Sequence, residues 1–266
     1  MNLFADSEFR AAARLSDGRL LVSCQTSNTV LVTDANGKLT GDVIEGNFNK
    51  PQGIAVDPKT NKVYIVDRYN NCVKVFDPDG KGFLFDKTIG AGQLQQPVGI
   101  AIADQKIYVA DNENHRVVAF YLNGNLWEII GEGPGRAPGQ LFCPCGVAVY
   151  RDLLIVAEWG NGRVQVFSKD RTPVFVVEGI KHAHAVACDD KGNVYVAQYS
   201  DRIVRRFKIC HTDDNKEPTF IVPDVHAQLA ADAPCGLMIG DDEPVIVATT
   251  RLIRLKAADW RSPAFP

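Results

Sequence analysis

Short runs of β-branched and aromatic residues alternate with polar turns along this chain of 266 residues. Residues 63–66, 107–110 and 194–197 are such runs, and each is followed, after a short polar loop, by another. Runs of this composition are typical of strands, and the Asp-Gly and Asn-Gly pairs between them are typical of turns. No segment has a convincing helical period. The pattern therefore predicts an all-β chain.

One unit recurs along the chain. Its clear copies open with Pro-x-Gly and lie at residues 51–76, 97–120 and 144–167. A fourth copy at 182–207 has lost that opening, and weaker copies lie at 11–33 and 233–255. We take the equivalent positions to be Gly53, Gly99, Gly146, His184 and Gly236. They are 46, 47, 38 and 52 residues apart, so close to six units fill the chain.

Four strands per unit predict a six-bladed β-propeller of four-stranded antiparallel blades, in a single domain that spans residues 1–266. In such a ring each blade covers its neighbour's apolar face, and closure protects the sheet edges. The last unit ends soon after Leu255, short of an outer strand. We expect residues 1–9 or so to supply it, so that an N-terminal strand closes the last blade.

The repeat carries a family resemblance. It reads Pro-x-Gly-(Ile/Val)-Ala-(Val/Ile), then (Val/Ile)-Tyr-(Val/Ile)-(Val/Ala)-Asp, then Asn-x-Arg-Val-x-x-Phe. This pattern resembles the NHL repeat over residues 51–207, and the linker at 131–146 is similar to that family's inter-blade segment. The resemblance implies a six-bladed propeller that usually binds protein or RNA. It also implies enzymatic relatives, the peptide-amidating lyases, which use metal-binding histidines.

Composition and charge remove several classes of protein. Hydrophobic residues make up 45% and charged residues 23% of the chain, and the net charge of −3 excludes a polybasic nucleic-acid binder. No apolar run approaches the roughly 18–20 residues of a membrane span, and the N-terminus lacks a signal-peptide pattern. The seven cysteines form no CxxC pair. We expect a reduced, cytoplasmic (intracellular) protein with no membrane partner and no DNA partner.

Some charged residues recur from unit to unit, and recurrence favours a structural role. The recurring acids are Asp67, Asp111 and Glu158. The recurring arginines are Arg116, Arg163 and Arg202. We expect these groups to fix loops through ion pairs and hydrogen bonds, whereas residues that break the repeat are freer to serve function.

Repeat-breaking residues are expected to converge on one face. In a four-stranded blade, the loop between the second and third strands opens on the same face as the link to the next blade. The candidate ligand-binding residues on that face are Arg68, Tyr69, His115, Phe142, Trp159, Tyr199 and Arg202. Aromatic rings among arginines suit either unpaired bases with their phosphates or a protein hot spot. The bland alternative is that these side chains cover the channel mouth and bind nothing.

The acidic overall balance favours a protein or peptide partner, with single-stranded RNA as the other candidate. Four histidines suggest a different function. His115, His182, His184 and His226 fall in segments expected on the same face, where several imidazoles would suit a divalent metal ion. The alternative is then a metal-dependent lyase or hydrolase resembling the peptide-amidating lyases. The chain departs from those lyases because it lacks a histidine at equivalent positions in regularly spaced blades.

Other signals of catalysis are absent. The sequence has no Gly-x-Ser-x-Gly, no HExxH and no phosphate-binding GxxxxGK[ST] motif. Cys145 and Cys235 share the x position of Pro-x-Gly, and a catalytic pair of such a cysteine with His184 of the intervening blade is conceivable, but buried, unreactive cysteine is the commoner case. We therefore predict a non-enzymatic binding module without catalytic residues, metal or cofactor.

Overall fold

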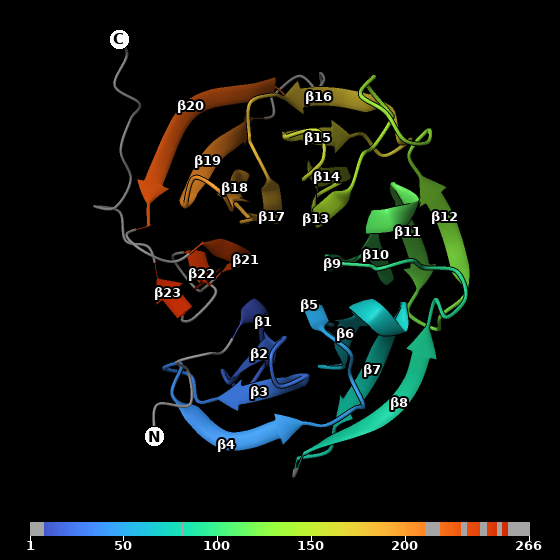
Figure 1. Ribbon diagram of the computed structural model, residues 1–266, viewed down its shortest axis with the longest axis vertical. Helices are drawn as coiled ribbons and strands as arrows, with labels where there is room; N and C mark the ends of the chain where they lie inside the picture. The colour runs from blue at the N-terminus through green and yellow to red at the C-terminus, as the bar shows by residue number, and fades with distance from the viewer. Residues whose placement is uncertain are drawn as a thin grey trace.

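The computed structural model describes residues 8–80, 82–210, 219–229, 233–239, 244–248 and 252–254. Figure 1 shows its sheets standing around a central axis, with the first strand of each sheet innermost. Neighbouring strands within each sheet are antiparallel. The prediction of an all-β propeller is confirmed.

Five sheets have four strands each. Blade 1 comprises β1 (Phe9–Arg14), β2 (Leu20–Cys24), β3 (Thr29–Thr33) and β4 (Leu39–Ile44). Blade 2 comprises β5 (Pro51–Val56), β6 (Val63–Asp67), β7 (Cys72–Pro78) and β8 (Phe83–Ile89). Blade 3 comprises β9 (Ile100–Ala103), β10 (Lys106–Asp111), β11 (Arg116–Tyr121) and β12 (Leu126–Ile130). Blade 4 comprises β13 (Pro144–Tyr150), β14 (Leu153–Glu158), β15 (Arg163–Phe167) and β16 (Pro173–Val177). Blade 5 comprises β17 (Ala183–Cys188), β18 (Asn193–Gln198), β19 (Ile203–Cys210) and β20 (Thr219–Gln228).

The prediction of six four-stranded blades is wrong, because the structure has five. The remaining sheet comprises β21 (Pro234–Ile239), β22 (Pro244–Ala248) and β23 (Leu252–Arg254), and it has three strands within the described residues. In blades 2 and 3 the loop between the second and third strands contains a 3-10 turn, η1 (Arg68–Asn70) and η2 (Asn112–Asn114) respectively. No helix in the described part of the chain is long and apolar enough to cross a membrane.

The expected N-terminal closing strand falls on residues 1–9, most of which lie outside the described part of the chain, so it stays a prediction. β1 begins at Phe9 and is the innermost strand of blade 1, where it pairs with β2. The Phe9 ring is 3% exposed and packs in one cluster with Cys235 and Met238 of β21. Burial of this ring between two sheets favours an inner position, since an outer strand would leave it at the periphery. Residues 1–7 lie outside the described residues.

The innermost strands close a ring. They contact one another in chain order from β1 to β21, and β21 contacts β1 in turn. The two ends also meet through the thiol of Cys235, whose Sγ lies 2.7 Å from the backbone oxygen of Phe9. The sheets therefore surround a central channel lined by the inner strands.

Close approach of these inner strands explains the glycine of the Pro-x-Gly pattern. A Cβ on Gly146 would lie 2.7 Å from the backbone nitrogen of Val186, and one on Gly53 would lie 2.7 Å from the backbone oxygen of Val98. Both atoms belong to the next blade along the chain. A side chain at either glycine would therefore push two blades apart.

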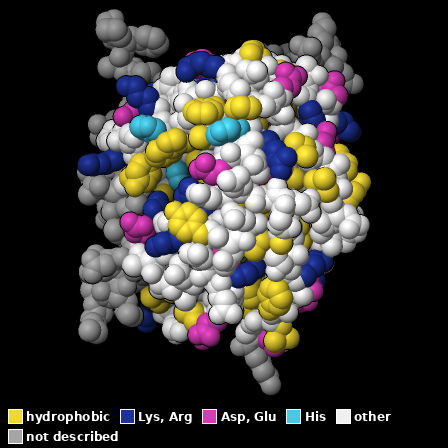
Figure 2. Space-filling view, turned by 45° about the vertical axis from the view of Figure 1, so that its right-hand side comes forward, with side chains coloured by type: hydrophobic (Ala, Val, Ile, Leu, Met, Phe, Trp, Pro, Cys, Tyr) yellow, Lys and Arg dark blue, Asp and Glu magenta, His cyan; other side chains and the backbone are white. Residues whose placement is uncertain are grey.

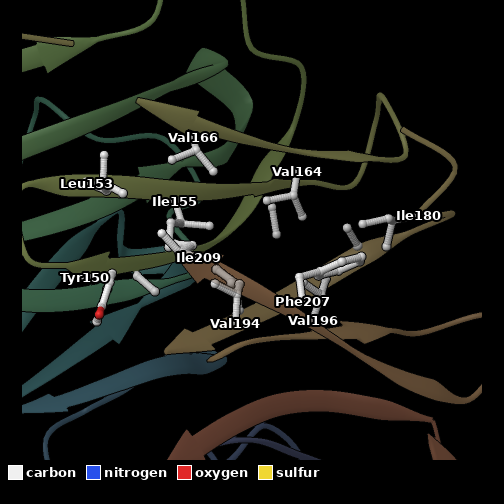
Figure 3. Packing of buried hydrophobic residues seen from close by; sticks show 14 residues of the cluster. Tyr150, Leu153, Ile155, Val164, Val166, Ile180, Val194, Val196, Phe207 and Ile209 are labelled. Carbon is white, nitrogen blue, oxygen red and sulfur yellow. The ribbon is translucent and has the colours of Figure 1, made fainter. Parts of the chain in front are cut away.

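Apolar contacts between adjacent blades make up the core. Figure 3 shows the cluster between blades 4 and 5, in which Ile155 and Val166 face Val194, Phe207 and Ile209. All five side chains are 2% exposed or less. Each blade thus completes its hydrophobic core only against its neighbour, which is why a single unit is not an independent fold.

We predict that Gly146→Ala destabilises the ring by about 1–3 kcal/mol, because the added methyl group meets backbone rather than a flexible side chain. Unfolding in urea, followed by tryptophan fluorescence, measures the change. Gly82→Ala is the matched control, since nothing lies within 4 Å of its Cβ and its backbone needs no left-handed φ. Equal stability of the two variants would contradict the close-approach explanation.

Candidate functional site at the channel mouth

A buried carboxylate at the end of the second strand fixes the loops of three blades. Asp67, Asp111 and Glu158 are each fully buried and occupy equivalent positions at the ends of β6, β10 and β14. Each accepts a hydrogen bond from a backbone N–H of the preceding inter-blade link, at 2.7, 2.6 and 2.9 Å respectively. The predicted loop-fixing role of these acids is confirmed.

A cation of the third strand completes each of these three anchors. Arg116 Nε donates to Asp111 at 2.8 Å, and Arg163 Nε donates to Glu158 at 2.7 Å. In blade 2 the cation is Lys74, whose Nζ lies 2.6 Å from Asp67. Arg163 is itself 1% exposed, so its pairing with Glu158 is a buried ion pair.

Arg202 is not the third member of the arginine group, so the predicted equivalence is wrong. Strand register pairs Asp111 with Arg116 and Glu158 with Arg163, whereas in blade 5 it pairs Gln198 with Ile203. Arg202 has a φ of +56°, like His115 at +54°, which is the left-handed residue that ends the loop one position earlier. Gln198 is uncharged, and its Nε2 donates to Asp201.

The loops and the links share one face, as predicted. The backbone N–H of Tyr69, Glu113, Trp159 and Tyr199 donates to the carbonyl oxygen of Asn49, Gln95, Cys143 and His182 respectively, at 3.0–3.2 Å. Each loop between second and third strands is therefore hydrogen-bonded to the link that enters its own blade. We call this surface the loop face.

Directly beneath the loop face, three successive residues of each of the six sheets line the channel. The first residues of these six triplets are Arg10, Gln52, Val98, Cys145, His184 and Cys235. In blade 4, Pro144 pairs with Glu158 and Gly146 with Ala157, and Cys145 lies between these two pairs. In blade 5, Ala183 pairs with Gln198 and Ala185 with Ala197, and His184 lies between them in the same way. Our alignment of His184 with the repeat glycine is therefore wrong by one residue: Ala185 replaces the glycine, and His184 takes the variable x position.

A pocket of about 400 Å³ lies at the mouth of the channel. Its lining combines the inner-strand position with the loop residues above it: Arg10, Gln52, Arg68, Val98, Asn112, Glu113, Cys143, Cys145, Trp159, His184 and Tyr199. Figure 2 shows a hollow on this side of the molecule, bordered by hydrophobic and histidine side chains with acidic and basic groups beside them. The volume is within the usual range for small-molecule pockets.

Aromatic rings form one wall of this pocket. The Trp159 ring centroid lies 5.7 Å from that of Tyr199, 5.8 Å from His184 and 4.4 Å from His182. His184 and Tyr199 are 5.9 Å apart. These distances are typical of interacting aromatic pairs, so the four rings from blades 4 and 5 support one another.

Basic and polar side chains of blades 1 and 2 line the pocket as well. Arg10 Nε donates to Gln25 at 2.5 Å, and an Arg10 NH2 group pairs with Glu8 at 3.0 Å. Arg68 lies over the Tyr69 ring, with its Cζ 5.5 Å from the ring centroid, and donates to Gln96 at 3.2 Å. Glu113 is the exposed acid at the rim.

His184 is held as a neutral imidazole. Its Nδ1 lies 2.7 Å from the carbonyl oxygen of Cys235, which only accepts, so Nδ1 carries the proton and Nε2 is left as an acceptor. Although part of the ring faces the pocket, burial lowers the pKa of His184 to about 4, and the charge of Arg10 adds to the effect. Burial likewise raises the pKa of the Cys145 thiol to about 12.

Cys143 and His115 form a second pair at the rim. The backbone N–H of Cys143 donates to His115 Nδ1 at 3.2 Å, and the Cys143 sulfur lies 3.8 Å from the same atom. Burial raises the pKa of this thiol, with a further contribution from Glu113, so it is not an activated thiolate. Its φ of +47° is shared by Lys50, Gln96 and His182 in the other links, so the strained backbone belongs to the link itself.

The structure brings together only part of the predicted ligand-binding set. Arg68, Trp159 and Tyr199 line the pocket. Tyr69 is 47% exposed beside Arg68, while His115 and Phe142 stack on each other with ring centroids 4.8 Å apart. Arg202 is exposed on its turn and does not line the pocket.

The candidate residues predicted from the sequence did not include Arg10, Gln52 and Asn112, although Gln52 and Asn112 fall in segments expected on this face. The signal for Gln52 was the variable x of Pro-x-Gly, which differs from blade to blade. Blade 1 carries no such opening, so Arg10 had no marker. Asn112 is equivalent to Arg68 and Trp159, as the residue that follows the anchoring acid.

The four histidines of the alternative metal site do not converge. His115 is engaged with Cys143, His182 stacks on Trp159 and contacts Ser200, and His184 is bonded to Cys235. His226 lies in the outer strand β20, paired with Arg205, rather than in a loop. Within the part of the chain that the structure describes, no three His, Cys, Asp or Glu side chains are grouped to hold a metal ion. The residues do not fit the metal that the resemblance to the lyases implies.

Comparison with known proteins gives a consistent picture. Residues 48–76 and 94–120 match the family model of the NHL repeat. Peptidylglycine alpha-amidating monooxygenase of Rattus norvegicus is 30% identical over 175 residues, which is 59% of this chain and 17% of that protein. Protein brain tumor of Drosophila melanogaster is 31% identical over 113 residues (40% and 11%), and NHL repeat-containing protein 2 of Bos taurus is 29% identical over 96 residues (31% and 13%). The chain thus spans less than a fifth of each of these relatives.

Solved structures show the same fold at low sequence identity. Virginiamycin B lyase from Staphylococcus aureus superposes with a TM-score of 0.67 at 11% identity, covering 100% of this chain and 88% of that one. A chain of the nidogen/laminin complex gives 0.62 at 17% identity, covering 75% of each. At these identities the likeness concerns the β-propeller alone.

We predict that Glu158→Gln destabilises the protein by about 3–5 kcal/mol, because it removes the buried counter-charge of Arg163 and leaves only the longer, 3.6 Å ion pair with the half-exposed Glu178. Urea unfolding measures the loss. Glu132→Gln, at an exposed position of the same blade's link, is the control and should stay within about 0.5 kcal/mol of wild type. The double variant Glu158→Gln/Arg163→Leu imitates the Gln198–Ile203 pair of blade 5 and should recover part of the loss. A single variant as stable as its control would contradict the anchoring role.

The lowered pKa of His184 predicts a specific pH dependence. Between pH 6.5, the ordinary value for histidine, and about 4, the unfolded chain binds a proton that the folded chain does not. Stability is therefore lost as the pH falls through this window, by about 2 kcal/mol from this residue at pH 5. His184→Gln removes this titration. Between pH 7.5 and 5 the free energy of unfolding of the wild type should therefore fall by about 2 kcal/mol more than that of the variant. A difference that is constant with pH would contradict the assignment.

Proposed function

Because this chain is an NHL-repeat β-propeller with a walled pocket on its loop face, we propose that it is a binding module for a protein or peptide partner and that it works without catalysis. The pocket would receive one group of the partner, while the surrounding loop face would contact the rest. This proposal extends the function predicted from the sequence, and it narrows the surface to the channel mouth.

One observation carries the proposal. Arg68, Asn112, Trp159 and Tyr199 take equivalent positions in four blades, each directly after the residue that anchors the loop. The anchoring residue is an acid or its amide in every case, whereas the next residue differs in charge, size and aromaticity. This position has the same place in each of these blades but a different side chain in each. Such a set of side chains is suited to contact a ligand that lacks the symmetry of the ring.

The chemistry of the face favours a protein over a nucleic acid. Trp, Tyr and Arg supply much of the binding energy of protein interfaces, and Trp159, Tyr199 and Arg68 are all present at the pocket. The exposed acids Glu113 and Asp201 lie in the same loops, where they would repel phosphates. The proposal therefore takes a protein or peptide as the partner and leaves RNA as the alternative outcome.

The engagement of the polar groups supports a function without catalysis. His184 has its Nδ1 proton committed to Cys235, and the thiols of Cys143 and Cys145 have raised pKa values. A catalytic cysteine would need the opposite shift, toward the thiolate.

Selection of a randomised peptide library on the purified protein tests this function. We expect enriched peptides to bind wild type and to lose at least about tenfold in affinity with Trp159→Ala or Tyr199→Ala, as for truncation of a hot-spot aromatic. Trp127→Ala is the matched control: Trp127 is a half-buried tryptophan of β12 that contacts Lys106, Arg171 and Tyr108, away from the pocket.

Two outcomes would overturn the proposal. Peptides that bind all variants equally would remove the channel mouth as the binding surface. Enrichment of sequences from a single-stranded RNA pool, with affinity that falls with salt and is lost on Trp159→Ala, would identify an RNA reader instead.

A further inference from the structure

Two buried donors in the pocket lining have no acceptor. The Gln52 side chain is 2% exposed, and neither its Nε2 nor the Nε of Arg68 has a hydrogen-bond partner among the described residues. Gln52 lies on β5 and Arg68 directly follows β6, the neighbouring strand of the same blade. Both residues line the same pocket. Because a buried donor without a partner is unfavourable, a ligand oxygen at this point gains more than one at an exposed donor.

The charge at this point is positive. Among the described residues, Arg10 is paired with Glu8, but no carboxylate forms an ion pair with Arg68. Its remaining contacts are the neutral Gln96 amide and the face of Tyr69. An arginine with an uncompensated charge favours an anionic acceptor over a neutral carbonyl.

The opposite wall is aromatic. In the ring order of the inner strands, blades 4 and 5 lie across the channel from blades 1 and 2. Trp159, His184 and Tyr199 therefore face the basic side of the pocket. Burial lowers the pKa of His184, and the charges of Arg10 and Arg68 lower it further. The lining is thus divided into a donor side and a ring-stacking side.

We propose that the pocket binds a carboxylate carried by an aromatic or apolar body. The carboxylate oxygens accept hydrogen bonds from Gln52 Nε2 and Arg68 Nε, and the body packs against Trp159 and Tyr199. Glu113 at the rim orients the ligand by repelling the acid from the blade 3 side. This inference rests on the proposed binding function and names the chemical group of the partner that enters the channel mouth.

Four small probes test the assignment. N-acetyl-phenylalanine carries the terminal carboxylate and the ring, its carboxamide lacks the charge, and N-acetyl-alanine lacks the ring. N-acetyl-Glu-Phe-amide offers a side-chain carboxylate instead, so its comparison with the first probe distinguishes a chain terminus from an internal acid as the source. Titration followed by NMR, with the tryptophan indole N–H signals as reporters, suits the roughly millimolar affinity of ligands of this size. We expect either N-acetyl-phenylalanine or N-acetyl-Glu-Phe-amide to bind at least about tenfold more tightly than both the carboxamide and N-acetyl-alanine.

Variants separate the donors from general stability. Gln52→Leu removes the unpaired donor at similar volume and should weaken the acid probe about tenfold while the melting temperature stays equal or rises. Arg68→Gln should weaken it similarly. Arg202→Gln removes one positive charge from the same face outside the pocket, so it controls for long-range electrostatics and should leave the affinity unchanged.

The results distinguish this inference from the binding function on which it rests. Three results would contradict the carboxylate subsite. The first is equal affinity for N-acetyl-phenylalanine and its carboxamide, and the second is no binding of either N-acetyl-phenylalanine or N-acetyl-Glu-Phe-amide. The third is an affinity for the acid probe that is the same in Gln52→Leu, Arg68→Gln and Arg202→Gln. In those cases the binding module still stands when selected peptides depend on Trp159. If no selected peptide depends on Trp159 while the acid probe still binds through Gln52 and Arg68, the subsite stands as a small-molecule site and the peptide-binding function fails.

Discussion

The buried carboxylate at the end of the second strand is the contact on which the loop face depends. In blades 2, 3 and 4 it accepts a hydrogen bond from a backbone N–H of the incoming link and forms an ion pair with a cation of the third strand. Loops without regular structure normally leave such backbone groups to water. Here one side chain, buried at the base of each loop, ties the link, the loop and the blade together. In blade 5 a neutral amide, Gln198, takes this place without a cation partner.

In this arrangement, the residue that fixes the loop and the residue that lines the pocket are neighbours in the sequence. Asp111 anchors and Asn112 lines the pocket; Glu158 anchors and Trp159 lines the pocket. The inner strand repeats the same division, because the glycine of Pro-x-Gly is required by the close approach of blades while the residue before it faces the channel. The two sets meet at the mouth, so most of the pocket lining comes from positions whose residue type differs from blade to blade.

The repeat makes the blades predictable from the sequence, whereas the contacts that close the ring are not expressed in any local pattern. Strand positions and the shared face of loops and links follow from patterns that recur, so several copies of the unit support each prediction. Phe9 had no such support: its role depends on packing against β21, more than two hundred residues away, which no local pattern expresses. The same limit applies to His184 and Arg202. Their alignments slipped by one residue because blade 5 lacks the Pro-x-Gly marker, and only strand register restores the frame. Trp159 and Tyr199 were found because aromatic residues stand out, whereas Gln52 is notable only once its burial is known.

The bond between His184 and the backbone of Cys235 links the pocket to the end of the chain. Cys235 belongs to β21, which also meets β1 through the contact between its sulfur and Phe9. During synthesis, blades 1 to 5 emerge before β21, and until that strand docks His184 lacks the carbonyl that fixes its proton and its ring. The aromatic wall is therefore completed by the same event that joins the two ends of the ring. A chain that stops before β21 has most of the lining residues but not their arrangement, so ligand recognition reports that β21 has docked and the ring has closed.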